Sequence, residues 1–114
     1  MALILWHNPR CSKSRDALSL LQARGQDVIL RRYLDDPPSL DELRGLLARL
    51  NCPVLEMVRT KEAAFKAAGL TKDSSQEDLL AAMAANPKLI ERPVLITDTK
   101  AVIGRPPEKV LDLI

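Results

Sequence analysis

The first third of the chain alternates between apolar runs of strand length and a run with helical spacing. Residues 2–7 are almost continuously apolar, which is typical of a strand buried on both faces. A helical pattern opens at Ser14, with Ser12 or Ser14 as a candidate cap and Gly25 placed to end the helix. Residues 28–34 form the next apolar run. We therefore expect two strands joined by a right-handed helical crossover.

The middle of the chain has a helical pattern throughout. Ser39 is followed three residues later by Glu42, which is the spacing of a capping box, and the pattern predicts a helix from there to about Leu50. Apolar residues recur at helical spacing over residues 53–70 and again over 75–89. These segments predict a helical insert.

The last part of the chain returns to strand-like runs. Residues 93–97 and 101–103 predict a hairpin around a turn at 98–100, and Pro106 or Pro107 can open a final helix that ends at Ile114. The predicted order is βαβ, helices, then ββα. This order indicates an α/β sandwich with a four-stranded mixed sheet and a helical insert.

Length and composition add limits to this fold. With 114 residues and no low-complexity tract or internal repeat, the chain predicts a single domain over 1–114. The apolar run before His7 is shorter than the core of a signal peptide, and no run approaches a membrane span. We therefore expect a cytoplasmic protein with no membrane association, and a monomer.

Charge and cysteine content argue against two classes of function. A net charge of +2, with a single Trp, Tyr and Phe, is too weak a signal for binding nucleic acid. Cys11 and Cys52 with one histidine are too few ligands for a structural zinc site, so we expect no metal. Cys52 precedes a proline at a predicted helix boundary, where a structural role is expected.

Cys11 is the candidate nucleophile because it follows a proline-containing turn and precedes a helix. A thiolate at a helix N-terminus is stabilised by unpaired N–H groups and by the helix dipole, and the same groups attract oxyanions. The four flanking residues His7, Arg10, Lys13 and Arg15 can add positive charge. A buried, inert cysteine is the alternative, but a turn rich in cations is unlike the surroundings of such a residue.

The string HNPRCSKSR at residues 7–15 closely resembles the HNPxCxxSR signature of the ArsC family, the glutaredoxin-dependent arsenate reductases of thioredoxin-like fold. The resemblance continues nearly to the end of the chain. It includes a Tyr-Leu pair at 33–34 followed by two prolines, the segment NPKLIERP at 86–93 and the segment IGRPP at 103–107. The chain resembles a shorter branch of the family without the C-terminal extension, and Ser12-Lys13 replaces a Gly-Thr pair after the cysteine.

The resemblance implies a site and a reaction. It implies a thioredoxin-like (glutaredoxin-like) fold, a cis bond at Pro93 beside the cysteine, and oxyanion-binding arginines at Arg59, Arg92 and Arg105. The implied reaction reduces arsenate to arsenite through a Cys11–arsenate adduct, with glutathione and glutaredoxin as reductants and no bound cofactor. Cys-x-x-Ser at Cys11 and Ser14 lacks a resolving cysteine, so an outside thiol must complete the reaction.

The roles of three residues of this string are left open by the sequence. The Ser14 hydroxyl can donate to the thiolate. His7 and Arg15 can either tune the thiolate or hold the loop.

Two other functions fit the same string. One is a monothiol, glutathione-linked oxidoreductase of the family whose substrate is not arsenate. The other is a regulator similar to the Spx proteins, which bind RNA polymerase. Those regulators typically carry Cys-x-x-Cys as a redox switch, and Ser14 argues against that role.

Overall fold

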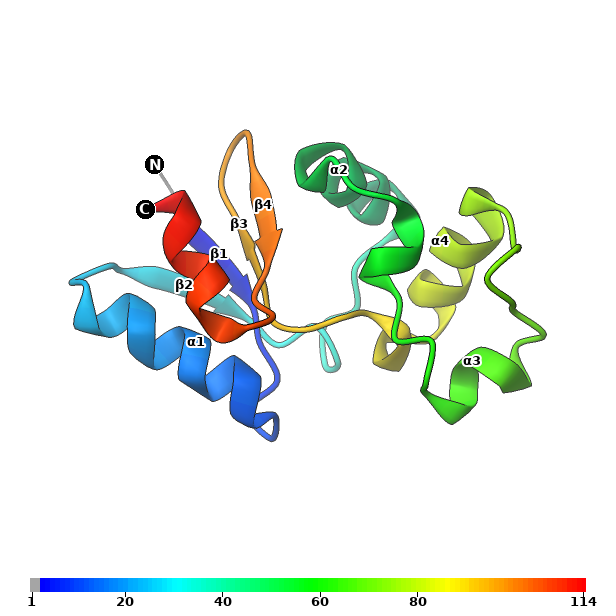
Figure 1. Ribbon diagram of the computed structural model, residues 1–114, viewed down its shortest axis with the longest axis horizontal. Helices are drawn as coiled ribbons and strands as arrows, with labels where there is room; N and C mark the ends of the chain where they lie inside the picture. Colours follow the sequence, from blue (N-terminus) through cyan, green and yellow to red (C-terminus); the bar gives the residue numbers. More distant parts are fainter. Residues whose placement is uncertain (1–2) are drawn as a thin grey trace. The chain divides into compact units, whose positions relative to one another are not determined.

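A four-stranded mixed sheet is the framework of the N- and C-terminal parts of the chain in the computed structural model, which describes residues 3–114 (Figure 1). The strands are β1 (Leu3–Trp6), β2 (Val28–Arg31), β3 (Val94–Ile96) and β4 (Ala101–Ile103), in the spatial order β2-β1-β3-β4. β1 runs parallel to β2 and antiparallel to β3, and β3 pairs antiparallel with β4. The predicted mixed sheet of four strands and the predicted hairpin are confirmed.

The chain divides into two compact units. Residues 1–36 and 92–114 make the sheet unit, and residues 37–91 make a helical unit. The single domain predicted over 1–114 stays a prediction. No helix in residues 3–114 has the length and apolar character needed to cross a membrane.

Two helices complete the sheet unit. α1 (Ser12–Ala23) follows β1, and the 3₁₀ helix η3 (Pro107–Leu113) follows β4 and packs against α1. Leu5, Leu21, Leu95 and Val110 lose all solvent exposure between these helices and the sheet. Burying each of these side chains contributes roughly 1.5–3 kcal/mol, so this cluster fixes α1, and with it the start of the helix, against the sheet.

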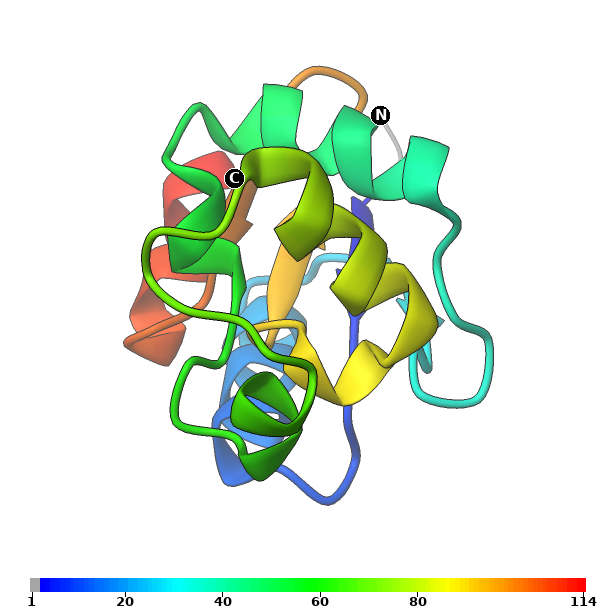
Figure 2. The same cartoon turned by 90° about the vertical axis from the view of Figure 1, so that its right-hand side faces the viewer.

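The helical unit contains α2 (Leu40–Leu50), η1 (Val54–Met57), α3 (Ala63–Ala67), α4 (Gln76–Ala85) and η2 (Pro87–Leu89) (Figure 2). The predicted capping box is confirmed: the Ser39 hydroxyl accepts from Glu42 N–H at 3.1 Å, and Glu42 Oε1 accepts from Ser39 N–H at 3.0 Å. α2 and α4 are joined by an ion pair of 2.7 Å between Arg44 and Glu77.

Two predicted helices of this unit are wrong in extent. Residues 53–70 break into η1 and α3 because Val58 forms a β-bridge with Ile90, which takes its backbone out of the helical conformation. Residues 75–89 break at Asn86, the residue before Pro87, because the position before a proline disfavours helix. The spacing of apolar residues predicts neither the long-range β-bridge nor the effect of the proline, so it could not predict these two breaks.

Three strands are also shorter than predicted. β2 ends at Arg31 instead of residue 34, because the Arg32 carbonyl accepts from the N–H groups of Asp35 and Asp36 at 3.0 and 2.9 Å and turns the chain. β3 begins after Pro93 and ends at Ile96. The predicted β1 included Ala2, which lies outside the described residues, and it ends at Trp6, one residue earlier than predicted. The final helix is a 3₁₀ helix from Pro107 to Leu113.

Candidate active site

Cys11 is itself the N-cap of α1. Its backbone is extended, with φ −94° and ψ 123°, and its carbonyl accepts the first helical hydrogen bond from Arg15 N–H at 3.1 Å. The predicted capping by Ser12 or Ser14 is therefore wrong, because both serines lie inside the helix. This position aims the thiol at the end of the helix where N–H groups have no helical partner.

Asn8 organises the loop that leads into Cys11. Its carbonyl accepts from Cys11 N–H at 2.9 Å, its Oδ1 accepts from Arg10 N–H at 3.0 Å, and its N–H donates to the Ser14 hydroxyl at 3.4 Å. Sequence reasoning did not single out this residue. The Asn-Pro pair at 8–9 was the available signal, because an Asn side chain before a proline commonly initiates a turn.

Two members of the predicted motif hold this loop in place. Arg15 Nη1 donates to the Pro9 carbonyl at 2.8 Å, so the side chain of Arg15 braces the loop from α1. Ser14 is completely buried. Of the two roles that the sequence left open for Arg15, the structure provides a contact for holding the loop.

The thiolate form of Cys11 is favoured by its surroundings. Cys11 is only 8% exposed, and this burial by itself raises the pKa of the thiol. The N–H of Ser14, the positive charge of Arg92, the N–H of Lys13 and the Ser14 hydroxyl act in the opposite direction, and together they hold the pKa of Cys11 below its ordinary value. The charged side chain in this set is Arg92, which is distant in sequence, and not one of the flanking cations.

His7 is buried and neutral. Its N–H donates to the Arg31 carbonyl at 2.8 Å, its Nδ1 atom is buried without a hydrogen-bond partner, and 5% of the residue is exposed. Burial and the charges of Arg32 and Arg15 lower the pKa of His7. Electrostatic tuning of Cys11 by His7 stays a prediction, and the neutral ring carries no positive charge for that purpose at pH 7.

The segment Arg92-Pro93 is held by the residues that follow β4. The Arg92–Pro93 bond is cis, and so is Arg105–Pro106, which the sequence reasoning did not foresee. Gly104 N–H donates to the Pro93 carbonyl at 2.8 Å, and Arg105 Nε donates to the Arg92 carbonyl at 2.8 Å. Nε and Nη1 of Arg92 are buried. The structure therefore brings together Cys11 and Arg92, and it links Arg92 to Arg105.

Arg59 belongs to the helical unit. Its N–H donates to the Leu89 carbonyl at 2.7 Å, its Nη1 lies 3.1 Å from a carboxylate oxygen of Glu62, and the same nitrogen is 3.5 Å from the Lys88 carbonyl. These contacts hold the guanidinium within its own unit. Its role as an oxyanion ligand stays a prediction.

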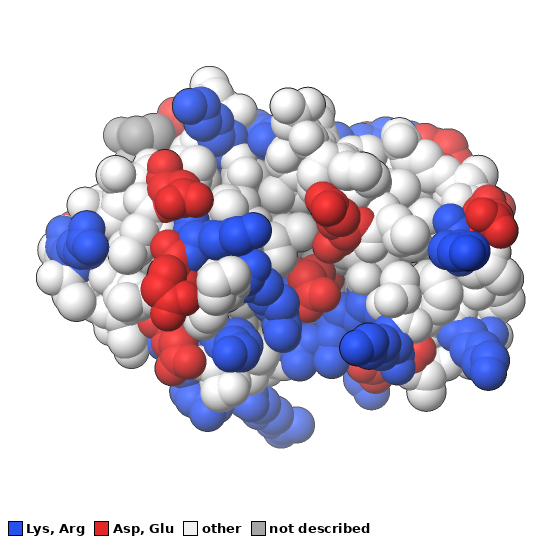
Figure 3. Space-filling model, in the orientation of Figure 1, with Lys and Arg blue, Asp and Glu red and all other residues white. Residues whose placement is uncertain are grey.

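The start of α1 is basic at its surface. Arg10, Lys13 and Arg15 are exposed there, and Figure 3 shows blue side chains projecting at the lower end of the sheet unit, where α1 begins. No group of histidine, cysteine and acidic residues suited to a metal ion occurs within residues 3–114. Burial and the nearby carboxylate of Glu56 raise the pKa of Cys52, as for an unreactive thiol.

This arrangement can attack an electrophile and hold an anion at one place. A stabilised thiolate lies beside helical N–H groups and a partly buried guanidinium, all within one unit. Such a site fits a nucleophilic substitution on an oxyanion, because the charge of the anion and the charge that develops in the transition state are both compensated.

The sheet, its two flanking helices, the cysteine at the start of the first helix and the cis-proline that follows Arg92 define a thioredoxin-like protein. The model of the ArsC family matches residues 6–113, and the chain belongs to the ArsC family.

Proteins similar to this chain include two named arsenate reductase. One, from Haemophilus influenzae, is 42% identical over 100% of both chains, and one, from Neisseria meningitidis, is 44% identical over 93% of this chain and 92% of its own length. A solved structure described as an arsenate reductase from Vibrio cholerae is 42% identical, with a TM-score of 0.95 over 100% of this chain and 98% of that chain. These matches agree with the thioredoxin-like fold.

Proposed function

We propose that this protein is an arsenate reductase in which Cys11 is the nucleophile. The single observation that carries the proposal is the lowered pKa of Cys11 at the start of α1, beside Arg92. Relatives named arsenate reductase, which match 93% to 100% of this chain, support arsenate as the substrate.

The first step forms a bond between Cys11 Sγ and arsenic. The thiolate attacks the arsenic atom of arsenate, and an oxygen of the anion leaves as water after taking up a proton. Arg92 compensates the negative charge, as does the positive end of α1, and we assign the same role to Arg105 and to Arg59 as further oxyanion ligands. A planar guanidinium suits this task because its donors match the spacing of two oxyanion oxygens.

Completion of the cycle needs two electrons from outside thiols, because Ser14 stands where a resolving cysteine would be. We assign these thiols to glutathione and glutaredoxin. The thiol of glutathione adds to arsenic and displaces a second water. A glutaredoxin thiolate then attacks the glutathione sulfur, a disulfide forms between them, and the electron pair left on arsenic reduces it from As(V) to As(III). Water cleaves the remaining sulfur–arsenic bond, which releases arsenite and returns the Cys11 thiolate.

This reaction requires no bound cofactor and no residue from another copy, so it is compatible with the predicted monomer. A monothiol, glutathione-linked oxidoreductase acting on another substrate would use the same thiolate. The Ser12-Lys13 pair after Cys11 is the feature that favours this second candidate, since Ser12 stands where a glycine would let the backbone approach an anion.

The test is steady-state arsenate reduction with glutathione, glutaredoxin and NADPH-coupled glutathione reductase. Wild type is compared with Cys11→Ser and with the matched control Cys52→Ser. We expect turnover in wild type and Cys52→Ser and none in Cys11→Ser. Absence of turnover in wild type, with Cys11 still rapidly alkylated at neutral pH, would refute arsenate as the substrate and favour the second candidate.

A further inference from the structure

β2 is an edge strand that exposes apolar side chains. It pairs with β1 on one side only, and no strand within residues 3–114 lies on its other side. Ile29 is 59% exposed and Leu30 is 44% exposed, whereas the other large hydrophobic residues of the four strands are buried or half-buried. An edge strand of this kind is a template for pairing with another strand.

The main-chain groups that face this open edge belong to Val28 and Leu30. The Arg31 carbonyl accepts from His7 N–H, so the polar groups of Arg31 face β1. These groups alternate in direction along a strand, so those of Val28 and Leu30 face outward. The next outward-facing residues along the chain are Gln26 and Arg32, and both have main-chain groups that are hydrogen-bonded within the chain. Gln26 N–H donates to the Leu21 carbonyl, and the Arg32 carbonyl accepts from Asp35 and Asp36 N–H.

We infer that β2 pairs antiparallel with β2 of a second copy of this chain, with Ile29 opposite Ile29 across a two-fold axis. In this register Val28 of each copy lies opposite Leu30 of the other, so both outward-facing residues form their hydrogen bonds. An axis at Leu30 would pair Val28 with Arg32, whose carbonyl already accepts hydrogen bonds within its own chain. An axis at Val28 would pair Leu30 with Gln26, whose N–H already donates within its own chain.

Charge complementarity selects the same register. Asp27 precedes β2 and Arg31 ends it, and they lie two residues to either side of Ile29 on the same face of the strand. Pairing about Ile29 places Asp27 of each copy opposite Arg31 of the other. The Arg31 guanidinium lies 5.5 Å from the centre of the Trp6 ring, and its Nε is directed to Asp36, which fixes its position at this edge.

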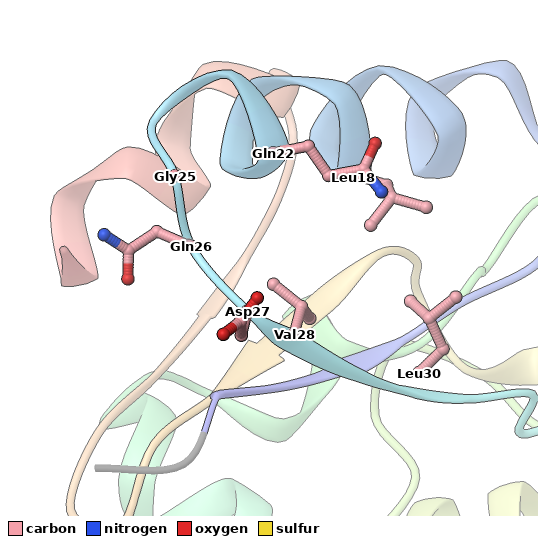
Figure 4. A pocket seen from close by; sticks show the side chains of 7 residues that line it. All are labelled: Leu18, Gln22, Gly25, Gln26, Asp27, Val28 and Leu30. Carbon is pink, nitrogen blue, oxygen red and sulfur yellow. The ribbon is translucent and has the colours of Figure 1, made fainter.

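The other face of β2 offers space for the second copy. A pocket of about 480 Å³ lies between α1 and β2, with Leu18 and Gln22 on the helix and Val28 and Leu30 on the strand (Figure 4). In the proposed pairing Leu30 of the second copy lies opposite Val28 at the border of this pocket. The partner leucine is thereby removed from water.

Pairing through four-residue strands buries less area than a permanent interface, so the dimer is weak and forms as the concentration rises. The predicted monomer remains the species in dilute solution. No residue of this interface belongs to the proposed arsenate site, so the dimer is independent of the proposed function.

The register is tested by disulfide crosslinking in a Cys11→Ser, Cys52→Ser background. In the proposed pairing the two Ile29 residues form a non-hydrogen-bonded pair with Cα atoms about 4.5 Å apart, which a disulfide can bridge. The two Leu30 residues are about 8 Å apart, beyond that limit. We expect Ile29→Cys to crosslink under mild oxidation faster than Leu30→Cys and faster than Ile114→Cys. Ile114 is the control because it directly follows η3, away from β2 in sequence, and is 43% exposed. Equal rates, or faster crosslinking of Leu30→Cys, would overturn the proposal.

Association itself is measured by sedimentation equilibrium over a range of concentrations. We expect the average mass of wild type to rise above the 12.6 kDa of one chain and that of Ile29→Lys to stay there. Asp27→Lys replaces two attractive pairs by repulsive ones and should raise the dissociation constant about tenfold. A wild type that stays monomeric, or a dimer that persists in Ile29→Lys, would contradict the pairing of β2.

Discussion

Arg105 Nε donates a hydrogen bond of 2.8 Å to the main-chain carbonyl of Arg92. The next residue pair repeats the contact, since Gly104 N–H donates to the Pro93 carbonyl at the same distance. The segment that carries Arg92 is therefore held at two consecutive carbonyls by two consecutive residues after β4. Because Arg92 lowers the pKa of Cys11, the position of Arg105 bears on the thiolate through Arg92.

Arg105→Lys is expected to reduce kcat/KM for arsenate about tenfold, because an ammonium group does not reproduce the planar Nε–H contact and a hydrogen bond from a charged group contributes about 1.5–3 kcal/mol. Arg105→Ala is expected to raise the pKa of Cys11 as well, as Arg92 loses its support. The measurements are steady-state kinetics and the pH profile of Cys11 alkylation, with Arg24→Ala as an exposed control. An unchanged alkylation profile in Arg105→Ala would show that Arg105 does not act through Arg92.

Cys11 alkylation is expected to follow a pKa below the ordinary thiol value, and Arg92→Ala is expected to raise that pKa by removing a positive charge. Ser14→Ala is expected to raise it as well, although the N–H of residue 14 remains, because the hydroxyl is lost. For arsenate, Arg92→Ala should lower kcat/KM roughly 10- to 100-fold, the equivalent of a lost charge-assisted hydrogen bond. The rate of iodoacetamide reaction between pH 5 and 10 gives the pKa. If it did not change in Arg92→Ala, the electrostatic assignment would be wrong.

His7 makes folding stability depend on pH. The pKa of His7 is lowered from 6.5 in the folded state. Well above pH 6.5 the imidazole is neutral in both the folded and the unfolded state. Below pH 6.5 the unfolded state binds a proton more readily than the folded state does. The free energy of unfolding should therefore fall as pH drops from 7.5 to 5.5, by at most about 1.4 kcal/mol from this group.

Urea unfolding at pH 7.5 and 5.5 measures this effect, and His7→Gln is the control because the chain has no other histidine. The decrease between the two pH values should be smaller in His7→Gln. If both proteins lost the same stability, the effect would belong to other groups.

Gly104→Ala should be destabilising, by about 1–3 kcal/mol. A Cβ at this position would lie 2.8 Å from Cγ of Pro93 and 3.0 Å from Cγ1 of the buried Val110, and a proline ring and a core side chain have little room to move.

Gly45→Ala is the matched control. It lies inside α2, where a Cβ would meet only the flexible end of Arg49 at 3.2 Å, and helix propensity favours alanine by about 1 kcal/mol. Thermal unfolding of both variants should give shifts of opposite sign. A stable Gly104→Ala protein would mean that the segment after β4 can shift without cost.

The parts of the fold that were predicted correctly depend on short-range signals. The four strands and the helix between the first two were read from apolar spacing, and the capping box at Ser39 and Glu42 involves residues three apart. The break in residues 53–70 could not be read in this way, because it depends on Val58 pairing with Ile90, which is 32 positions away.

In the candidate site, too, the features that depend on neighbouring residues were predicted and those that depend on long-range packing were not. The position of Cys11 at a helix start followed from the local pattern. The helix begins at Ser12, two residues earlier than expected, so that the cysteine itself is the N-cap. That Arg92, rather than the flanking cations, contributes charge to the thiol depends on long-range packing. The sequence analysis expected this charge from the flanking cations and reached Arg92 only through the family resemblance, as an oxyanion ligand, because no local pattern relates residue 92 to residue 11.

The sheet unit is built from the two ends of the chain, and its central strand β1 lies between β2, which follows it closely, and β3, which begins at Val94. During synthesis on the ribosome, β1, α1 and β2 emerge first. About sixty residues separate the end of β2 at Arg31 from Val94, where the second neighbour of β1 begins. Cys11 is thus synthesised about eighty residues before Arg92. A chain whose synthesis stops inside the helical unit would carry the cysteine without its cation, so full thiolate reactivity of Cys11 requires synthesis to have passed residue 92.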